Sequence, residues 1–210
     1  MIFRSFPVPP LGCNCSIIGD SLSKKAIVVD PGGDHEGILA TLRDLDLTVS
    51  LIIHTHAHFD HFLASGEMHK ATGAPLCLHR ADQPLWENLE LQCQLFEVPY
   101  IPVPAPNQWL GDGETLSVGN LAAIATHTPG HTPGSMCFHL ESEKLLLAGD
   151  TLFRGSIGRT ELWGGDAAAI ERSIKKRLYT LDEATRVITG HGPETTIGFE
   201  IRNNAFVRGG

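Results

Sequence analysis

The chain has too little positive charge to bind nucleic acid and contains no long apolar run. Lys and Arg number 16 against 24 Asp and Glu, a formal net charge of −8 over 210 residues. Phosphate backbones and anionic lipids repel an acidic chain, so we expect neither a nucleic-acid nor a membrane partner. The apolar runs are short, such as LAAIA at 121–125, whereas a membrane helix needs about 20 predominantly apolar residues.

The sequence also lacks the marks of a secreted protein. Its cysteines are odd in number, five, and Arg4 is followed by prolines instead of an apolar segment. Secreted domains use paired cysteines and a signal peptide, so we expect reduced thiols and a cytoplasmic protein. Cys13 and Cys15 form a C-x-C pair with no matching ligand nearby, and we interpret them as ordinary buried or turn thiols.

The length and composition predict a single globular domain over residues 1–210. An apolar share of 42% and a mean hydropathy near zero exclude wholesale disorder. No internal repeat or low-complexity linker divides the chain. A chain of this size buries roughly 70% of its unfolded surface, so its core needs no disulfide or metal.

Apolar runs and helical spacings alternate along the chain. Strands are expected at 11–19, 25–30 and 51–53, in four runs between 114 and 149, and at 186–190. Helices are expected at 36–45, 63–72, 80–96 and after Asp166, which fits an N-cap. The proline-rich stretch 99–106 is expected to cross the surface in an extended form. These elements fall into two blocks that each mix strands with helices.

The most informative feature is a histidine cluster directly after an apolar strand. The run HTHAHFDH, residues 54–61, holds four imidazoles and a carboxylate. Imidazole is the commonest metal-binding side chain, and a bound metal keeps crowded rings neutral. An internal position and regular spacing exclude an expression tag, so the run predicts a metal site.

Three further candidate ligands stand in turns at strand ends. They are His131 in TPGHTPGS, Asp150 in LLLAGDT and His191 in TGHGP. A loop at the end of a strand can direct a side chain into a cleft. Each motif alone is a weak signal, but together with the histidine run they supply seven ligands, enough for two metals that share a carboxylate.

The motif THxHxDH, followed in order by GH, GD and GH, resembles the metallo-β-lactamase superfamily. Within it, THAHFDH, TPGHTPGS, GDTLFRGSIGRTEL and GHGPETTIGFE are most similar to the glyoxalase II (hydroxyacylglutathione hydrolase) group of thioester hydrolases. The resemblance implies an α/β fold, a four-layer αβ/βα sandwich with the metal site at one edge. The chain ends soon after GFEIRNN and so resembles the short bacterial members, without the C-terminal helical extension.

The resemblance also implies two groups of metal ligands joined by a bridge. His56, His58 and His131 would hold the first metal, Asp60, His61 and His191 the second, and Asp150 both. His54 stands where the family has an apolar strand residue, so we interpret it as structural or, at most, as a support for a ligand. The remaining histidines lack a ligand motif and are interpreted as structural: His35, His69, His79, His127 and His139.

Asp60 and Asp150 are the expected catalytic carboxylates. Two divalent metals about 3.5–4 Å apart can share a water and lower its pKa to about 7. The bridging hydroxide would attack a thioester carbonyl, with Asp60 orienting it, and the thiolate leaves without an acid because thiols have a pKa of about 8.5. Zinc is the favoured metal, and iron or manganese is also compatible with His and Asp ligands.

The expected substrate is a small thioester, S-lactoylglutathione or a related acyl-glutathione. Arg159, on the loop after the GD motif, stands where the family places a basic residue near glutathione. We therefore expect Arg159 to bind substrate. A structural role, with Arg159 paired to Glu161, is the alternative.

Other functions within and outside this fold stay open. A mononuclear iron dioxygenase acting on glutathione persulfide would use only His56, His131 and Asp150, but SIG replaces that branch's CG before GRT. A lactonase or β-lactamase is disfavoured by the GRT segment. A non-enzymatic zinc protein is disfavoured because structural zinc sites are closed four-ligand cages.

Overall fold

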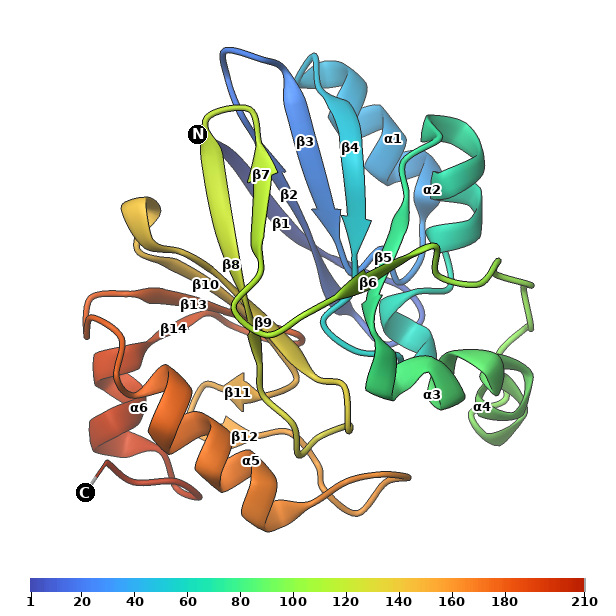
Figure 1. Cartoon of the computed structure of the whole chain (residues 1–210). Coiled ribbons are helices and arrows are strands. Elements are labelled where there is room, and N and C mark those ends of the chain that lie inside the picture. Colours follow the sequence, from blue (N-terminus) through green and yellow to red (C-terminus); the bar gives the residue numbers. More distant parts are fainter. Residues whose placement is uncertain (210) are drawn as a thin grey trace.

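The computed structural model describes residues 1–209 and contains two six-stranded sheets. Their strand orders are β1-β2-β3-β4-β5-β6 and β14-β13-β10-β9-β8-β7. Figure 1 shows α1 and α2 on the outer side of the first sheet and α5 and α6 on the outer side of the second. The fold is therefore the four-layer αβ/βα sandwich that the sequence predicts.

The first sheet is antiparallel from β1 to β3 and parallel from β3 to β6. Its strands are β1 Ile2–Val8, β2 Cys13–Gly19, β3 Lys25–Val29, β4 Thr48–Ile53, β5 Leu76–His79 and β6 Gln108–Leu110. Its helices are α1 His35–Asp44, α2 Ser65–Thr72, α3 Gln83–Glu87 and α4 Leu89–Leu95. Apolar side chains of these helices, such as Ile38 and Met68, share one core with the strands.

The second sheet carries the C-terminal helices. Its strands are β7 Thr115–Val118, β8 Leu121–His127, β9 Met136–Leu140, β10 Leu145–Gly149, β13 Arg186–Thr189 and β14 Thr195–Thr196, and the hairpin β11 Leu152–Phe153 and β12 Ser156–Ile157 lies beside it. Helix α5 Ala167–Ser173 continues as a π-helical turn, Ile174–Leu178, and α6 is Ile197–Asn203. Ile170, Ile174 and Leu178 are buried against the sheet, as their spacing predicts.

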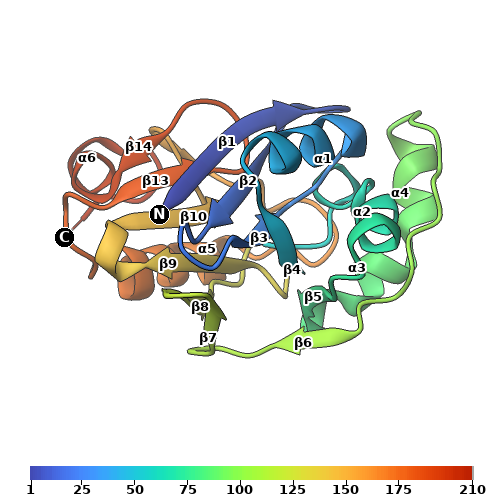
Figure 2. The same ribbon diagram turned by 90° about the horizontal axis from the view of Figure 1, so that it is seen from above.

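A second core lies between the sheets. It combines Ile18, Ile27 and Ile53 of the first sheet with Phe138 and Leu147 of the second. Figure 2 shows the two sheets side by side from above. The side chains of this core pack between them. The residues of β3, β4 and β10 are therefore buried on both faces, which explains why these strands read as continuous apolar runs.

Most predicted elements are confirmed, and the differences have local causes. The expected helix at 80–96 is divided into a 3-10 turn, α3 and α4, with Asn88 between the two helices. Asp166 is the N-cap of α5 and accepts a hydrogen bond from Ala169 N at 2.9 Å. The sequence reading missed seven elements, of which all but β1 and α6 are at most four residues long: β1, β5, β6, β11, β12, β14 and α6.

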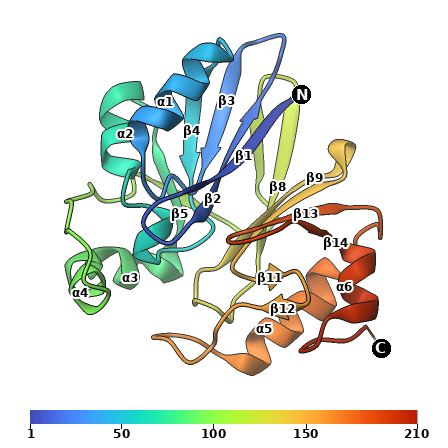
Figure 3. The same ribbon diagram turned by 180° about the vertical axis from the view of Figure 1, so that it is seen from behind.

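The two sheets meet at the edge where their parallel strands end. Asn14 N donates to Gly190 O at 2.7 Å, and Cys13 pairs with His191 as an isolated bridge. Figure 3 shows the turn after β13 reaching the start of β2. This edge gathers the loops that follow β3, β4, β10 and β13. Within residues 1–209, no helix has both the length and the apolar composition needed to span a membrane.

Candidate metal centre

Strand ends deliver the predicted ligands to one edge of the sandwich. Strand β4 leads into the histidine run, β10 into Asp150 and β13 into His191. The approach between the last two is tight, because a Cβ added at Gly190 would collide with Asp150 Oδ1. Only glycine lets these neighbouring strand ends come this close.

The first group of predicted ligands consists of His56, His58 and His131. Their ring nitrogens lie within 4.8 Å of one another. His58 Nδ1 is 2.9 Å from His131 Nε2. The other ring nitrogen of His131, Nδ1, is fixed by the carbonyl oxygen of Arg159 at 2.8 Å. That bond leaves Nε2 directed at the centre of the group, as a metal-binding imidazole requires.

The second group consists of Asp60, His61 and His191, whose ligand atoms also lie within 4.8 Å. His191 Nε2 is 3.1 Å from Asp60 Oδ2 and 3.2 Å from His61 Nε2. Nitrogen atoms at such spacing repel one another when both carry protons. A cation between them would instead give each lone pair a partner.

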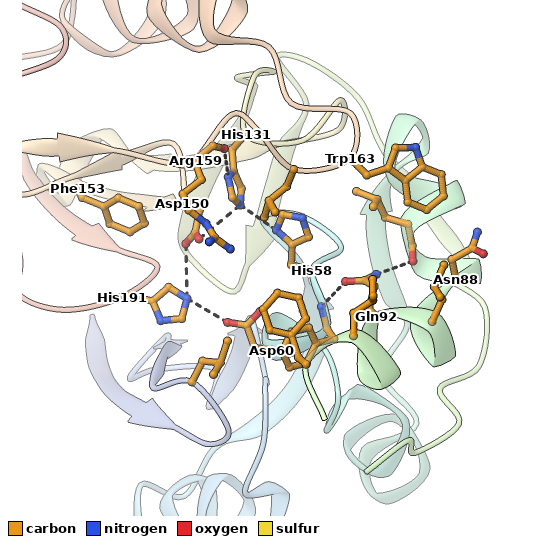
Figure 4. Close-up of a pocket in the computed structure, with 17 residues that line it drawn as sticks. His58, Asp60, Asn88, Gln92, His131, Asp150, Phe153, Arg159, Trp163 and His191 are labelled. Carbon is orange, nitrogen blue, oxygen red and sulfur yellow. Dashed lines mark hydrogen bonds and ion pairs between the residues drawn. The ribbon is translucent and has the colours of Figure 1, made fainter. Parts of the chain in front are cut away.

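Asp150 lies between the two groups. Its Oδ2 is 3.5 Å from His131 Nε2 (Figure 4). Its Oδ1 is 3.5 Å from His61 Nε2. The structure therefore brings together all seven residues that the sequence singled out. One oxygen of the carboxylate faces each group, which is the arrangement that a bridging ligand needs.

Two buried polar atoms in this cluster lack a hydrogen-bond partner. They are His56 Nε2 and Asp150 Oδ1, and both are orphaned within residues 1–209. Leaving a buried polar atom unpaired costs about 1–3 kcal/mol, so native proteins seldom tolerate it. The unpaired atoms are a nitrogen and an oxygen of ligand type. The donor set thus fits divalent metal ions.

The protonation states of His56, His58 and Asp60 agree with this fit. Burial lowers the pKa of His58 to about 3, and neighbouring imidazoles add to the effect. Burial also holds the pKa of His56 well below its usual range. Burial acts to raise the pKa of Asp60, but the imidazoles of His61 and His191 outweigh it and bring that pKa to about 2. At neutral pH these groups offer neutral rings and an ionised carboxylate.

Asp30 supports the centre and was missed in the sequence reading. It follows β3, and its Oδ2 accepts from Thr55 Oγ1 at 2.6 Å and lies 2.9 Å from His61 Nδ1. Its Oδ1 accepts from Thr55 N at 2.7 Å. The carboxylate thereby fixes both the start of the histidine run and the ring orientation of His61. The DPGG segment is the sequence signal that could have identified it.

Two further supports hold the loop around His58. Asp82 accepts from Ala57 N at 3.0 Å, and Gln92 Oε1 accepts from Phe59 N at 3.0 Å. Gln92 Nε2 donates to Ala57 O at 3.1 Å. The backbone on both sides of His58 is therefore fixed by buried side chains. Neither support stands in a recognisable motif.

His54 and Cys13 lie beside the centre. His54 is fully buried, with Nδ1 2.9 Å from Cys77 O and Nε2 2.7 Å from Ser65 Oγ. Both ring nitrogens are used, which agrees with the structural interpretation. All five cysteines are buried free thiols. Cys13 is more than a packing residue, because its Sγ is 3.3 Å from His61 Nδ1.

A pocket of about 490 Å³ opens onto the ligands. Arg159 lines it, as do Asp60 and Asp150. The Arg159 side chain is 59% exposed, and its Nε lies 3.7 Å from Glu161 Oε1. A pair this long and exposed is weak, so Arg159 is free to bind an anion.

Comparison with known proteins agrees with the geometry. A family model described as the Metallo-beta-lactamase superfamily matches residues 8–191. Hydroxyacylglutathione hydrolase GloC of Haemophilus influenzae is 36% identical over 209 residues, 99% of this chain and 98% of that protein. The crystal structure of BLEG-1 B3 metallo-beta-lactamase has a TM-score of 0.91 at 35% identity and covers 98% of this chain and 99% of that one. The structure of TTHA1623 in a di-iron-bound form has a TM-score of 0.89 at 35% identity, with coverages of 97% and 100%. By motif, fold and sequence, the chain belongs to the metallo-β-lactamase superfamily.

Proposed function

We propose that the protein is a metal-dependent thioester hydrolase with two divalent metals, acting on S-lactoylglutathione or related acyl-glutathiones. The observation that carries this proposal is the position of Asp150, with one carboxylate oxygen toward each histidine group. The likeness to the protein named hydroxyacylglutathione hydrolase supports the substrate class. Zinc is the proposed metal, and the likeness to a di-iron-bound structure supports iron as well.

Two metals in these groups would supply a water of lowered pKa and a Lewis acid for the carbonyl oxygen. Asp60 lines the pocket and stays ionised, so it can accept a hydrogen bond from the attacking water and orient it. His58 and His131 would bind as neutral ligands. Hydrolysis forms a C–O bond to water and breaks the C–S bond, and the thiol leaves with one proton of the water.

The side chains that line the pocket favour attack by water over attack by a Ser, Thr or Cys side chain. No Ser, Thr or Cys lines the pocket in residues 1–209, so a covalent acyl-enzyme has no hydroxyl or thiol nucleophile there. A thiol is a good leaving group, with a pKa of about 8.5, so a general acid is not required. The site therefore suits thioesters better than amides with poor leaving groups.

The test is a substrate panel on protein of measured metal content. We expect thiol release from S-lactoylglutathione in equal amount to acid, near two metal equivalents per chain, and loss of turnover after chelation that added metal restores. Oxygen uptake with glutathione persulfide on protein with one iron per chain would instead favour the dioxygenase. Absence of thiol release from fully loaded protein would contradict the proposal.

β-Lactam hydrolysis is the second candidate. The likeness to BLEG-1, named a B3 metallo-beta-lactamase, favours it over other members of the fold. A β-lactam in the same panel separates the two functions. We expect its kcat/KM to be lower than that of the best thioester, and the reverse order would make the lactam the better candidate substrate.

A further inference from the structure

Large apolar side chains gather around the mouth of the pocket. Leu11, Leu91, Leu95, Phe96 and Trp163 line it and are between 43 and 72% exposed. They are five of the ten large apolar side chains exposed in residues 1–209. Apolar surface concentrated beside a candidate catalytic centre is typical of a ligand-binding wall.

Four of these side chains form one side of the pocket. Leu91 and Leu95 lie four residues apart on α4, and Phe96 follows them and packs on Phe59 with ring centroids 4.8 Å apart. Trp163 lies on the same side of the centre as Gln92, away from Phe153 (Figure 4). We call Leu91, Leu95, Phe96 and Trp163 the α4 wall.

The polar side chains near the α4 wall, Gln92 and Asn88, hydrogen-bond to the backbone. The Gln92 amide bonds to the backbone of Phe59, Ala57 and Leu85. The Asn88 Nδ2 donates to Pro84 O at 2.8 Å. Among the pocket residues that the structure describes, Arg159 alone is a Lys or Arg. The wall therefore has little to offer the carboxylates, amides and ammonium of a glutathione arm.

We infer that the α4 wall binds the acyl chain of the substrate, so that medium-length apolar acyl groups are preferred over lactoyl. This inference rests on the proposed thioester hydrolysis and specifies its substrate class. The polar thiol arm then extends toward Arg159 and solvent, where its charges stay hydrated. A lactoyl group is short and carries a hydroxyl, so it leaves the α4 wall exposed to water.

The test is an acyl series on one thiol. Acetyl-, butyryl-, hexanoyl-, octanoyl- and S-lactoylglutathione are compared by kcat/KM on metal-loaded protein. A fully buried methylene is worth about fourfold, and a half-buried one about twofold, or roughly 60-fold from acetyl to octanoyl. We expect a rise of this order, with S-lactoylglutathione near the acetyl end.

Two variants test whether the dependence of kcat/KM on acyl length arises at the α4 wall. The double variant Leu91→Gln/Leu95→Gln changes exposed positions and should reduce the octanoyl-to-acetyl ratio to less than about tenfold, since the chain loses its contacts. Leu22→Gln is the matched control, because Leu22 is 81% exposed and is not among the pocket residues. Its ratio should equal that of the wild type.

The outcomes separate the two proposals. If no thioester of the series is hydrolysed, the proposed function fails. If thioesters are hydrolysed with a flat or falling dependence on acyl length, the acyl-chain inference is overturned and the hydrolase proposal stands. An octanoyl-to-acetyl ratio that is unchanged in the double variant also overturns it.

Discussion

Asp82 provides the sharpest test of how the candidate metal centre is held. It is fully buried, and its Oδ1 accepts from Gly134 N at 2.6 Å. Its Oδ2 accepts from Thr132 Oγ1 at 2.7 Å and from Ala57 N at 3.0 Å. Thr132 and Gly134 follow His131 in the chain, and Ala57 follows His56. One carboxylate therefore ties the loop of the first sheet to the loop of the second.

The substitution Asp82→Asn keeps the shape and replaces one acceptor by a donor. That NH₂ group faces N–H and O–H donors, so one or two hydrogen bonds to a charged acceptor are lost, each worth about 1.5–3 kcal/mol. Burial raises the pKa of Asp82 to about 6, which shows that the buried charge itself is costly and offsets part of this loss. We expect the free energy of unfolding to fall by about 2–4 kcal/mol at pH 7.5.

Urea unfolding of metal-free protein measures this loss, and competition with a chelator measures metal affinity. Asp46→Asn is the matched control, because Asp46 is 85% exposed and only 3.6 Å from Lys24, a pair worth less than about 1 kcal/mol. We expect weaker metal binding in Asp82→Asn and none of these changes in the control. A stability loss below about 0.5 kcal/mol, with unchanged metal affinity, would refute the inference that Asp82 joins the two loops.

Four further outcomes are expected. Asp150→Ala should lower metal content below two equivalents and abolish turnover, by elemental analysis and thioester assay. His54→Ala should leave kcat within about tenfold, or 1.4 kcal/mol of barrier, since His54 bonds only to Cys77 O and Ser65. Arg159→Ala should raise KM for S-lactoylglutathione about 5- to 30-fold at nearly constant kcat, in steady-state kinetics. Hydrogen bonding, first from Ser23, lowers the pKa of Asp20 to about 2, so its stabilising effect is present above about pH 4 and is lost toward pH 2. Thermal unfolding of Asp20→Asn should accordingly approach the wild type as the pH falls through that range.

The candidate ligands could be predicted from the sequence because their signals are local. Four histidines and an aspartate stand in one run, and the other ligands follow apolar strands or glycines. Asp82 and Gln92 carry no such signal, and the only local mark of Asp30 is the DPGG segment after β3. Their partners lie 25 to 52 residues away for the two aspartates, and these distances close only in the folded chain. Support residues of this kind depend on tertiary contacts that no local pattern records.

The missed elements have a similar origin. Strands β5 and β6 are four and three residues long. Such segments are too short to show the alternation of apolar and polar residues that marks a strand. The break between α3 and α4 occurs at Asn88, inside a stretch whose apolar spacing favours one continuous helix. That break turns α4 so that Gln92 reaches the histidine run while Leu91 and Leu95 stay exposed at the pocket. The helix break that the sequence analysis did not predict thus positions residues of the candidate site.

The division of the ligands between the sheets gives the centre a mechanical role. His56 and His58 come from the first sheet, whereas their partner His131 comes from the second. The second group is divided in the same way, with His191 supplied by the second sheet. Any cation held by either group therefore joins both halves of the sandwich. Since a ligand that binds only the folded state stabilises it by mass action, metal binding would strengthen the edge where the backbone joins the sheets through Asn14 and Gly190.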